Sequence, residues 1–406
     1  LSCRFCEAPL SRVVVDLGVS PIANDLIDLE KAHEAEPKYP LKIFVCEECN
    51  LVQLQGLPNI FRDDYVYYSS VSDTTVESAR LYVNKMRKML ELGADSLVVE
   101  VASNDGYLLQ HMLPLGIPAM GVEPCADVAQ VAKSRGIPTM VEFFGEDMAQ
   151  KIVGEKRRRA DLLLANHVLA HVPDLNDFIR GMKVLLAEDG VLTVEFQHLM
   201  NLIEQTQFDT LYHEHMSYFT LLALIKIFAH HGLQVFDVSE LPVHGGSLRV
   251  FAKHQGLEAF PVTSNVEKVL SQERSCGLDG FQAYAPFYQR VLNCKESLLN
   301  FLKAAKERGQ TVVGYGAPAK GNTLLNYCGI NSDLLQYTVD RAPSKQNKLL
   351  PGTRIPVCLP SRIMETKPDY ILILPWNIKD EIMRKMAGVK EWGCQFVVPI
   401  PEVTIY

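Results

Sequence analysis

Four consecutive residues, Tyr212-His213-Glu214-His215, place a phenol, a carboxylate and two imidazoles in one short stretch. A neutral imidazole is a suitable general base near pH 7, and a neighbouring phenol or carboxylate can orient it or polarise a carbonyl group. In an extended chain Tyr212 and Glu214 would face away from His215, so a turn is needed to bring the three together. Two other roles stay open: the histidines could bind a metal ion, although no third ligand is evident, or pack beneath the aromatic residues that follow.

Two Cys-x-x-Cys pairs stand near the N-terminus, Cys3 with Cys6 and Cys46 with Cys49. Each pair supplies two thiolates from one tight turn, and four thiolates form the tetrahedral site that structural zinc prefers. A redox dithiol is the alternative, but such a motif should begin a helix after a strand, and neither pair does. We therefore predict a structural zinc ion bound by all four cysteines, with no position left open for water.

A short turn follows an apolar run at 96–101 and resembles motif I of the class I S-adenosylmethionine (SAM) methyltransferases. In that motif an acidic residue precedes small residues that let the backbone approach the cofactor. Only one glycine is present here, and asparagine tolerates the left-handed backbone that the turn needs. The cofactor-binding residues predicted in this turn are Glu100, Ala102, Asn104, Asp105 and Gly106.

Polar residues also end the next strands expected in the same unit. Glu123 follows the run 119–122, where a carboxylate can accept hydrogen bonds from both ribose hydroxyls; the alternative is a solvated strand-end carboxylate. Asn166 and His167 end the following strand, and we assign them to the cofactor site because the carboxyl edge of a parallel sheet faces the ligand crevice. His171 is equally open to a catalytic role and to capping the next helix.

A second glycine-rich turn, 314–321, joins an expected strand to a helix. Its backbone N–H groups, the helix N-terminus and Lys320 could cradle a diphosphate, and the alternative is tight strand–helix packing. It is not a Walker A loop, because glycine and asparagine follow Lys320. The predicted substrate-binding residues are Tyr67, Tyr68, His244, Gly245, Gly246, Ser247, Gly316, Ala317, Lys320 and Lys345.

The pattern of elements divides the chain into three parts. Residues 1–62 are short segments between turn signals, and metal would supply much of their folding free energy. Residues 63–240 and 241–406 alternate helices with apolar strands, which predicts parallel sheets; one helix is expected to begin at Tyr107. The predicted fold class is α/β, with two doubly wound Rossmann-like domains and a small N-terminal zinc-binding module. The first of these two domains carries the SAM-type turn, and the second carries the turn that could cradle a diphosphate.

The composition argues against several classes of partner. The net charge is −8, whereas binding of a phosphate backbone requires a basic surface. No apolar run approaches the roughly 18–20 residues of a membrane span. The opening residues contain no apolar signal-peptide core. We therefore expect a cytoplasmic protein that binds neither nucleic acid nor a membrane.

Taken together, the order of these motifs resembles that of the nucleotide-sugar C-methyltransferases, the SAM-dependent enzymes that make 3-C-methyl branched deoxysugars. The resemblance spans nearly the whole chain and rests on both cysteine pairs, 103–107, 121–124, 169–174, 212–215 and 314–321. It implies a nucleoside-diphosphate 4-keto-deoxysugar substrate (dTDP or GDP), and a monomer or weak homodimer whose zinc module helps to close the cleft.

The same resemblance implies roles for individual residues. His215 would remove the hydrogen on sugar carbon 3, Tyr212 and Glu214 would orient it or steady the enolate oxygen, and His171 would line the cleft. Carbon methylation requires such a base and an oxyanion stabiliser beside the methyl donor. A zinc-ribbon RNA methyltransferase is the alternative, and a zinc-binding interaction module without enzymatic activity is a third class.

Overall fold

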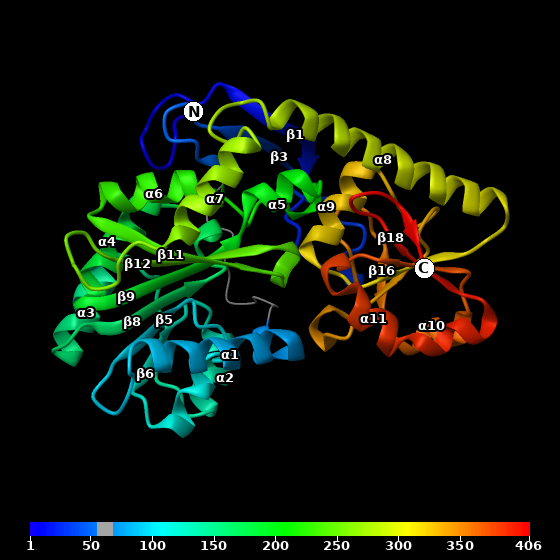
Figure 1. The fold of residues 1–406 in the computed structure, drawn as a ribbon. Coiled ribbons are helices and arrows are strands. Elements are labelled where there is room, and N and C mark those ends of the chain that lie inside the picture. The colour runs from blue at the N-terminus through cyan, green and yellow to red at the C-terminus, as the bar shows by residue number, and fades with distance from the viewer. Residues whose placement is uncertain (55–67) are drawn as a thin grey trace.

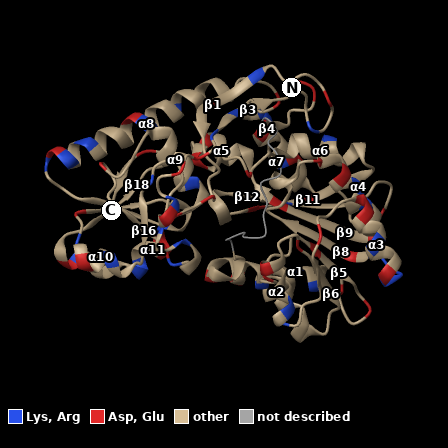
Figure 2. Cartoon of the chain, turned by 180° about the vertical axis from the view of Figure 1, so that it is seen from behind, with Lys and Arg blue, Asp and Glu red and all other residues tan. Residues whose placement is uncertain are grey.

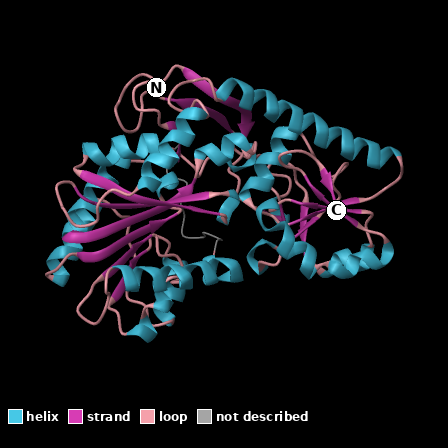
Figure 3. Cartoon of the chain, in the orientation of Figure 1, coloured by secondary structure: helices cyan, strands magenta, loops and turns pink. Residues whose placement is uncertain are grey.

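The computed structural model of the chain describes residues 1–54 and 68–406, and its strands form three sheets (Figure 1). A small antiparallel sheet belongs to the N-terminal region, and two larger sheets follow along the chain. Helices lie on both sides of each larger sheet (Figure 3). The predicted α/β class, with two Rossmann-like units and a small N-terminal module, is confirmed.

The small sheet is completed by a strand from far along the chain. Its order is β1-β3-β4-β10, and every pairing is antiparallel. The strands are β1 (Arg12–Ser20), β3 (Tyr39–Val45), β4 (Val52–Leu54) and β10 (Ser217–Tyr218). Because β10 begins two residues after His215, the predicted catalytic stretch leads directly into the N-terminal module.

The seven-stranded sheet has the order β11-β12-β9-β8-β5-β6-β7. Its strands are β5 (Val98–Val101), β6 (Ala119–Val122), β7 (Thr139–Met140), β8 (Ala160–Asn166), β9 (Leu186–Gln197), β11 (Leu233–Leu241) and β12 (Ser247–His254). The strands from β9 to β7 are parallel, whereas β12 and β11 are antiparallel additions. The boundary predicted at residue 240 therefore falls in a hairpin of this sheet, and the domain division stays a prediction.

Helices cover both faces of this sheet, so its strands are apolar on both sides. In β5, Val98 belongs to a buried cluster that contains residues of α1 and α2, and Val99 belongs to a second cluster that contains residues of α3, α4 and α6. The helices of this unit are α1 (Asp73–Met89), α2 (Ala126–Ser134), α3 (Glu146–Lys156), α4 (Leu175–Leu185), α5 (Leu199–Glu204), α6 (Leu221–His230) and α7 (Ser264–Ser275).

The helix expected from Tyr107 is wrong. The chain forms two 3-10 turns there, because Pro114 lacks an N–H group and Gly116 has a left-handed φ of 65° that ends the second turn. The 3-10 turns of the described chain are η1 (Leu29–Lys31), η2 (Ser69–Val71), η3 (Leu109–His111), η4 (Leu113–Leu115), η5 (Leu169–His171), η6 (Phe208–Thr210), η7 (Val243–Gly245), η8 (Pro343–Lys345), η9 (Trp376–Ile378) and η10 (Ala387–Trp392).

The eight-stranded sheet has the order β19-β18-β17-β13-β14-β16-β15-β2, with parallel strands from β18 to β16. Its strands are β2 (Ile27–Asp28), β13 (Val312–Tyr315), β14 (Thr338–Val339), β15 (Lys348–Leu349), β16 (Pro356–Cys358), β17 (Tyr370–Ile373), β18 (Gln395–Val398) and β19 (Thr404–Ile405). Its helices are α8 (Tyr284–Glu307), α9 (Ala319–Cys328), α10 (Ser361–Thr366) and α11 (Lys379–Lys385). Since β2 comes from the N-terminal region, that region takes part in two sheets.

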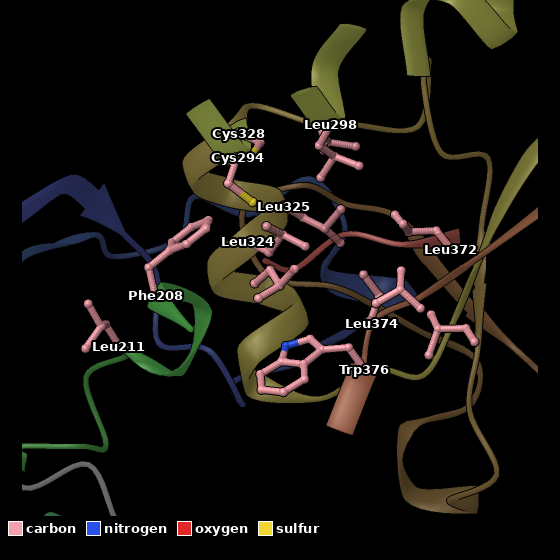
Figure 4. Packing of buried hydrophobic residues seen from close by; sticks show 14 of the residues in the cluster. Phe208, Leu211, Cys294, Leu298, Leu324, Leu325, Cys328, Leu372, Leu374 and Trp376 are labelled. Atoms are coloured by element: carbon pink, nitrogen blue, oxygen red, sulfur yellow. The ribbon is translucent and has the colours of Figure 1, made fainter. Parts of the chain in front are cut away.

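One apolar core joins the N-terminal module to the C-terminal unit. Figure 4 shows Phe208 and Leu211, from the segment before the Tyr-His-Glu-His stretch, on one side of α9 and Leu372 on the other. The same cluster contains residues of β1, β3 and β4. The segment that leads into the predicted catalytic stretch is thus held by buried contacts with both neighbouring units. Among the described helices, none has the length and apolar character needed to cross a bilayer.

Candidate active site

A turn at residues 212–215 brings Tyr212 and His215 together. The backbone N–H of His215 donates to the carbonyl of Tyr212 at 2.9 Å, which closes the turn. Tyr212 Oη lies 2.9 Å from His215 Nε2, and His215 Nδ1 lies 2.9 Å from the carbonyl of Thr210. Because a carbonyl can only accept, Nδ1 carries the proton and Nε2 accepts from the phenol. His215 therefore has a basic nitrogen directed at Tyr212.

The surroundings of His215 keep it uncharged. Burial, and next the neighbouring His171, hold the pKa of His215 well below its ordinary value. The rings of His171 and His215 lie 4.8 Å apart, and His171 Nδ1 donates to the carbonyl of Glu214 at 2.6 Å. Burial lowers the pKa of His171 to about 4. His171 does not cap the next helix, because Asp174 does so by accepting from the Asp177 N–H.

Glu214 and His213 face the N-terminal module. Glu214 Oε1 accepts from the Asn24 side chain at 3.0 Å and from its backbone N–H at 3.3 Å. His213 Nε2 donates to the carbonyl of Tyr39 at 3.3 Å. The part of the chain that the structure describes contains no hydrogen bond between the Glu214 carboxylate and His215, so the Thr210 carbonyl orients the imidazole instead. The predicted orienting role fits Tyr212 and does not fit the Glu214 side chain.

The turn after β5 has the backbone that a cofactor loop requires. Ala102, Asn104 and Gly106 have φ values of 53°, 52° and 78°. Gly106 suits this position because its φ is positive and because a Cβ atom there would lie 2.3 Å from the side chain of Ile137. The backbone N–H of Asn104 donates to Glu123 Oε2 at 2.9 Å. The strand end of β6 thus holds the turn in place.

Glu123 is buried, which removes the alternative of a solvated carboxylate. Its exposed fraction is 4%, and its Oε1 accepts from the Cys125 N–H at 2.9 Å. Each carboxylate oxygen accepts one backbone N–H, and the Cys125 side chain is a further hydrogen-bond partner. Burial raises the pKa of Glu123 despite these bonds. Burial, and then the charges of Glu123 and Asp105, raise the pKa of Glu100 well above its ordinary value.

Asp105 holds the connector that precedes α1. Its carboxylate accepts from the Ser70 backbone and hydroxyl, and Arg135 lies 3.6 Å from the same oxygen. Asn104 Oδ1 accepts from the Ser69 N–H at 2.8 Å. The two serines and Arg135 were missed from the sequence, because nothing in their type distinguishes them from solvated residues. Tyr68, which precedes them, is half-buried, and Tyr67 lies outside the described residues.

A charged pair lies beside the end of β8. His167, with a left-handed φ of 54°, contacts Glu195 at 3.0 Å through Nε2, and Arg249 binds the other carboxylate oxygen. Burial opposes ionisation of Glu195, but the His167 hydrogen bond and the Arg249 charge outweigh it and lower its pKa to about 2. The His167 ring lies 4.2 Å from that of His244. Glu195 and Arg249 were missed, and their opposite positions on β9 and β12 explain the pairing.

His244 to Ser247 pack tightly where the two large units meet. Burial, followed by the His167 charge, lowers the pKa of His244 to about 3. A Cβ atom on Gly245 would lie 2.7 Å from the Trp376 side chain, and one on Gly246 would lie 2.4 Å from Asn201. Ser247 Oγ donates to the carbonyl of Val243 at 3.1 Å. Close packing therefore accounts for both glycines.

The turn after β13 also packs closely. A Cβ atom on Gly316 would lie 2.6 Å from Pro375, which supports the packing alternative for this glycine. The Ala317 N–H donates to Asp340 Oδ2 at 2.7 Å, and Lys345 Nζ donates to the Ala317 carbonyl at 2.9 Å. Asp340 thus holds the turn after β13 in the same way that Glu123 holds the turn after β5. The Ala317 N–H is already bound to a carboxylate, which leaves the lysines as the candidate anion-binding groups.

Lys320 points toward the interface between the two large units. Its Nζ donates to Asn377 Oδ1 at 2.9 Å and lies 4.5 Å from the centre of the Trp376 ring. Trp376 Nε1 in turn donates to Asp209 at 2.7 Å. Burial lowers the pKa of Lys320, an effect that Asp209 opposes. Asp209 directly precedes Thr210, whose carbonyl accepts from His215 Nδ1, so these contacts link Lys320 to the segment that holds His215.

The four predicted zinc ligands converge. The sulfur atoms of Cys3, Cys6, Cys46 and Cys49 all lie within 4.8 Å of one another. Two Sγ–Sγ distances across the pairs are 3.5 Å, close to the edge of a tetrahedron with Zn–S bonds of about 2.3 Å. These two distances are between cysteines of different Cys-x-x-Cys pairs. A redox dithiol would instead bring together the two cysteines of one pair. Among the described residues this is the only such group of His, Cys, Asp and Glu.

Three family models match successive parts of the chain. Family models match at residues 3–59 ("Putative zinc binding domain"), 77–238 ("Methyltransferase domain") and 242–401 ("C-methyltransferase C-terminal domain"). The C-methyltransferase NovU of Streptomyces niveus is 35% identical over 402 residues, which cover 98% of this chain and 95% of NovU. The match to the zinc-binding domain and the cysteine cluster together confirm zinc as a cofactor. The match to the methyltransferase domain agrees with SAM.

Solved methyltransferase structures resemble part of the chain. Magnesium protoporphyrin IX methyltransferase of Synechocystis, solved with bound SAM, is 15% identical and covers 45% of this chain and 79% of its own, with a TM-score of 0.34. The methyltransferase in complex with the Trm112 activator of Haloferax volcanii is 12% identical, with a TM-score of 0.36, and covers 48% of this chain and 99% of its own.

Proposed function

The chain belongs to the family of SAM-dependent C-methyltransferases, and we propose that it methylates carbon 3 of a nucleoside-diphosphate 4-keto-deoxysugar. The observation that carries this proposal is the hydrogen-bonded pair of Tyr212 and His215 beside His171. These residues supply a neutral base and a phenol at one place. Methylation of carbon requires both, because a proton must leave the carbon and the oxygen beside it must carry the resulting charge.

We assign the base to His215. Its Nδ1 proton is held by the Thr210 carbonyl, so Nε2 is the basic atom. Nε2 takes the proton from carbon 3, the electrons of that C–H bond form the enolate, and the charge moves to the 4-oxygen. The Tyr212 hydroxyl, displaced from Nε2, then donates to this oxygen. Burial keeps His215 unprotonated in the resting enzyme, so that the base is available at neutral pH.

The cofactor would be held by the turn after β5 and by Glu123. Bound SAM supplies an electrophilic methyl group. Glu123 fits the ribose because backbone donors fix both of its oxygens at the end of β6, and a carboxylate can accept more than two hydrogen bonds. Asn166, which ends β8 and lies 3.5 Å from the Tyr107 hydroxyl, is the further residue assigned here. His167 is bound to Glu195, and its ring lies 4.2 Å from that of His244, so we propose that it lies between the cofactor and the sugar.

The C-terminal unit would hold the nucleotide diphosphate. Lys320 and Lys345 are cations whose bonds are to an amide oxygen and a backbone carbonyl, so their charge is available to an anion. Lysine and arginine alternate with acidic residues over the helices of both large units in Figure 2, and the net charge is −8. This distribution supports a small phosphorylated substrate over RNA. We propose a cytoplasmic enzyme, a monomer or weak homodimer, that acts on a dTDP or GDP sugar.

The test is transfer of a labelled methyl group. Purified protein is incubated with methyl-labelled SAM and a panel of dTDP and GDP 4-keto-deoxysugars, together with a bulk RNA sample. We expect label on carbon 3 of one of the sugars and none on RNA. Label on RNA alone would favour the zinc-ribbon RNA methyltransferase, and label on a sugar oxygen or nitrogen would contradict carbon methylation.

A further inference from the structure

The N-terminal module is attached directly to the end of the catalytic turn. Arg4 lies inside the first cysteine knuckle, and its guanidinium donates to the carbonyls of Met216 at 3.4 Å and Leu54 at 2.9 Å. The Leu54 N–H donates to the same Met216 carbonyl at 3.0 Å. Ser217 and Tyr218 then pair with β4. The residue that follows His215 is therefore held by the zinc module.

The knuckle that carries Arg4 is tied to the metal site. The backbone N–H of Arg4 donates to Gln53 Oε1 at 2.9 Å, and Gln53 Nε2 donates to the sulfur of Cys3 at 3.1 Å. Partners of this kind fix the orientation of metal ligands. A continuous set of bonds thus joins the cysteine cluster to the Met216 carbonyl.

A second contact holds the turn itself. Asn24 gives both its side-chain and backbone N–H groups to Glu214 Oε1. Glu214 is buried, and its other oxygen has no hydrogen-bond partner among the described residues. The orientation of the turn therefore depends on a residue 190 positions away in the sequence.

We propose that Arg4 and Asn24 are positioning residues, through which the zinc module sets the place of His215 in the active site. The catalytic part of this inference rests on the proposed function. Within the methyltransferase unit, Thr210 and Tyr212 hold the imidazole, and the Met216 N–H donates to Ala170. The N-terminal module fixes the other side of the turn. A displacement of about 1 Å at a catalytic group can lower turnover by about 100-fold.

The test uses the full chain with Arg4→Met and Asn24→Ala, and Asn176→Ala as the matched control. Asn176 also joins an amide to the N-terminal module, at the Phe5 carbonyl, but it lies on α4 and makes no hydrogen bond to residues 212–218 in the described chain. Hydrogen–deuterium exchange needs no substrate and reports the amides of His215 and Met216. It is combined with zinc content, binding of S-adenosylhomocysteine, and kcat and KM for the sugar.

We expect each test variant to lose amide protection at residues 212–218 while β5 stays protected. Zinc should remain at one per chain, cofactor affinity within about twofold, and kcat should fall by about 10- to 100-fold with little change in KM. The control should resemble the wild type. Unchanged protection and kcat in both variants would overturn the proposal, as would joint loss of zinc and cofactor binding, which would indicate a purely structural role. If the wild type methylates no sugar, the proposed function fails, and the exchange data alone decide the positioning.

Discussion

Replacing Glu123 with glutamine tests the cofactor site without any knowledge of the sugar. Both carboxylate oxygens accept backbone N–H groups at 2.9 Å in a position that is 4% exposed. Glutamine keeps one accepting oxygen and turns an NH2 group toward the second donor. The loop then contains an unpaired buried N–H, which costs about 1–3 kcal/mol. A ribose would also lose a charged acceptor, and hydrogen bonds to charged groups contribute about 1.5–3 kcal/mol.

The unpaired N–H is present with and without cofactor and lowers stability, so the lost charged acceptor alone predicts that Glu123→Gln weakens S-adenosylhomocysteine binding by about 1.5–3 kcal/mol, or about 10- to 150-fold. Titration calorimetry at pH 7.5 measures this directly. Glu100→Gln is the comparison variant, since Glu100 is equally buried but its Oε2 accepts no hydrogen bond from the described residues. Glutamine at that position takes no acceptor away from the backbone of the turn, so affinity should fall less than in Glu123→Gln. Equal losses in both variants, or no loss at Glu123, would refute the assignment of the ribose to Glu123.

Three further outcomes are expected. Native protein should contain one zinc per chain by metal analysis, and a chelator that removes it should lower the unfolding temperature; metal-free native protein would contradict the site. Burial raises the pKa of Glu214 to about 7. The free energy of unfolding of the wild type should therefore fall by up to about 3 kcal/mol as the pH rises from about 4.5 to 7, and remain at the lower value above pH 7. Urea unfolding at pH 5 and pH 8 measures this fall, which should be absent in Glu214→Gln. Lys320→Met should weaken dTDP and GDP binding by about tenfold in calorimetry, and unchanged affinity for both would remove Lys320 from the diphosphate site.

Features fixed by local spacing could be predicted from the sequence. The cysteine knuckles are one example, because each brings two thiolates together within four residues and the fold has only to join the two pairs. Glu123 is another, since the ends of neighbouring parallel strands must meet at one edge of the sheet. For the knuckles the sequence separation within each pair is short, and for Glu123 the topology of the parallel sheet dictates the contact.

Contacts between distant segments could not be predicted in this way. Arg249 meets Glu195 only because β12 returns antiparallel to β9, and nothing in the sequence of β12 indicates that pairing. Glu214 seemed the natural partner of His215, yet the turn directs it to Asn24 instead. The turn at residues 212–215 directs the Glu214 side chain away from His215. Its partner, Asn24, lies in the N-terminal module, which the sequence pattern had set apart from the methyltransferase unit.

The most direct test of the central claim is exchange of the hydrogen on sugar carbon 3 with deuterated water, with S-adenosylhomocysteine bound so that no methyl group can be transferred. The substrate is the 4-keto sugar that the labelling assay identifies. Wild-type protein should catalyse this exchange, and His215→Asn should slow it by about 10²- to 10⁴-fold while binding both ligands with unchanged affinity. Exchange at the wild-type rate in His215→Asn would contradict the assignment of the base and leave His171, 4.8 Å away, as the group to examine.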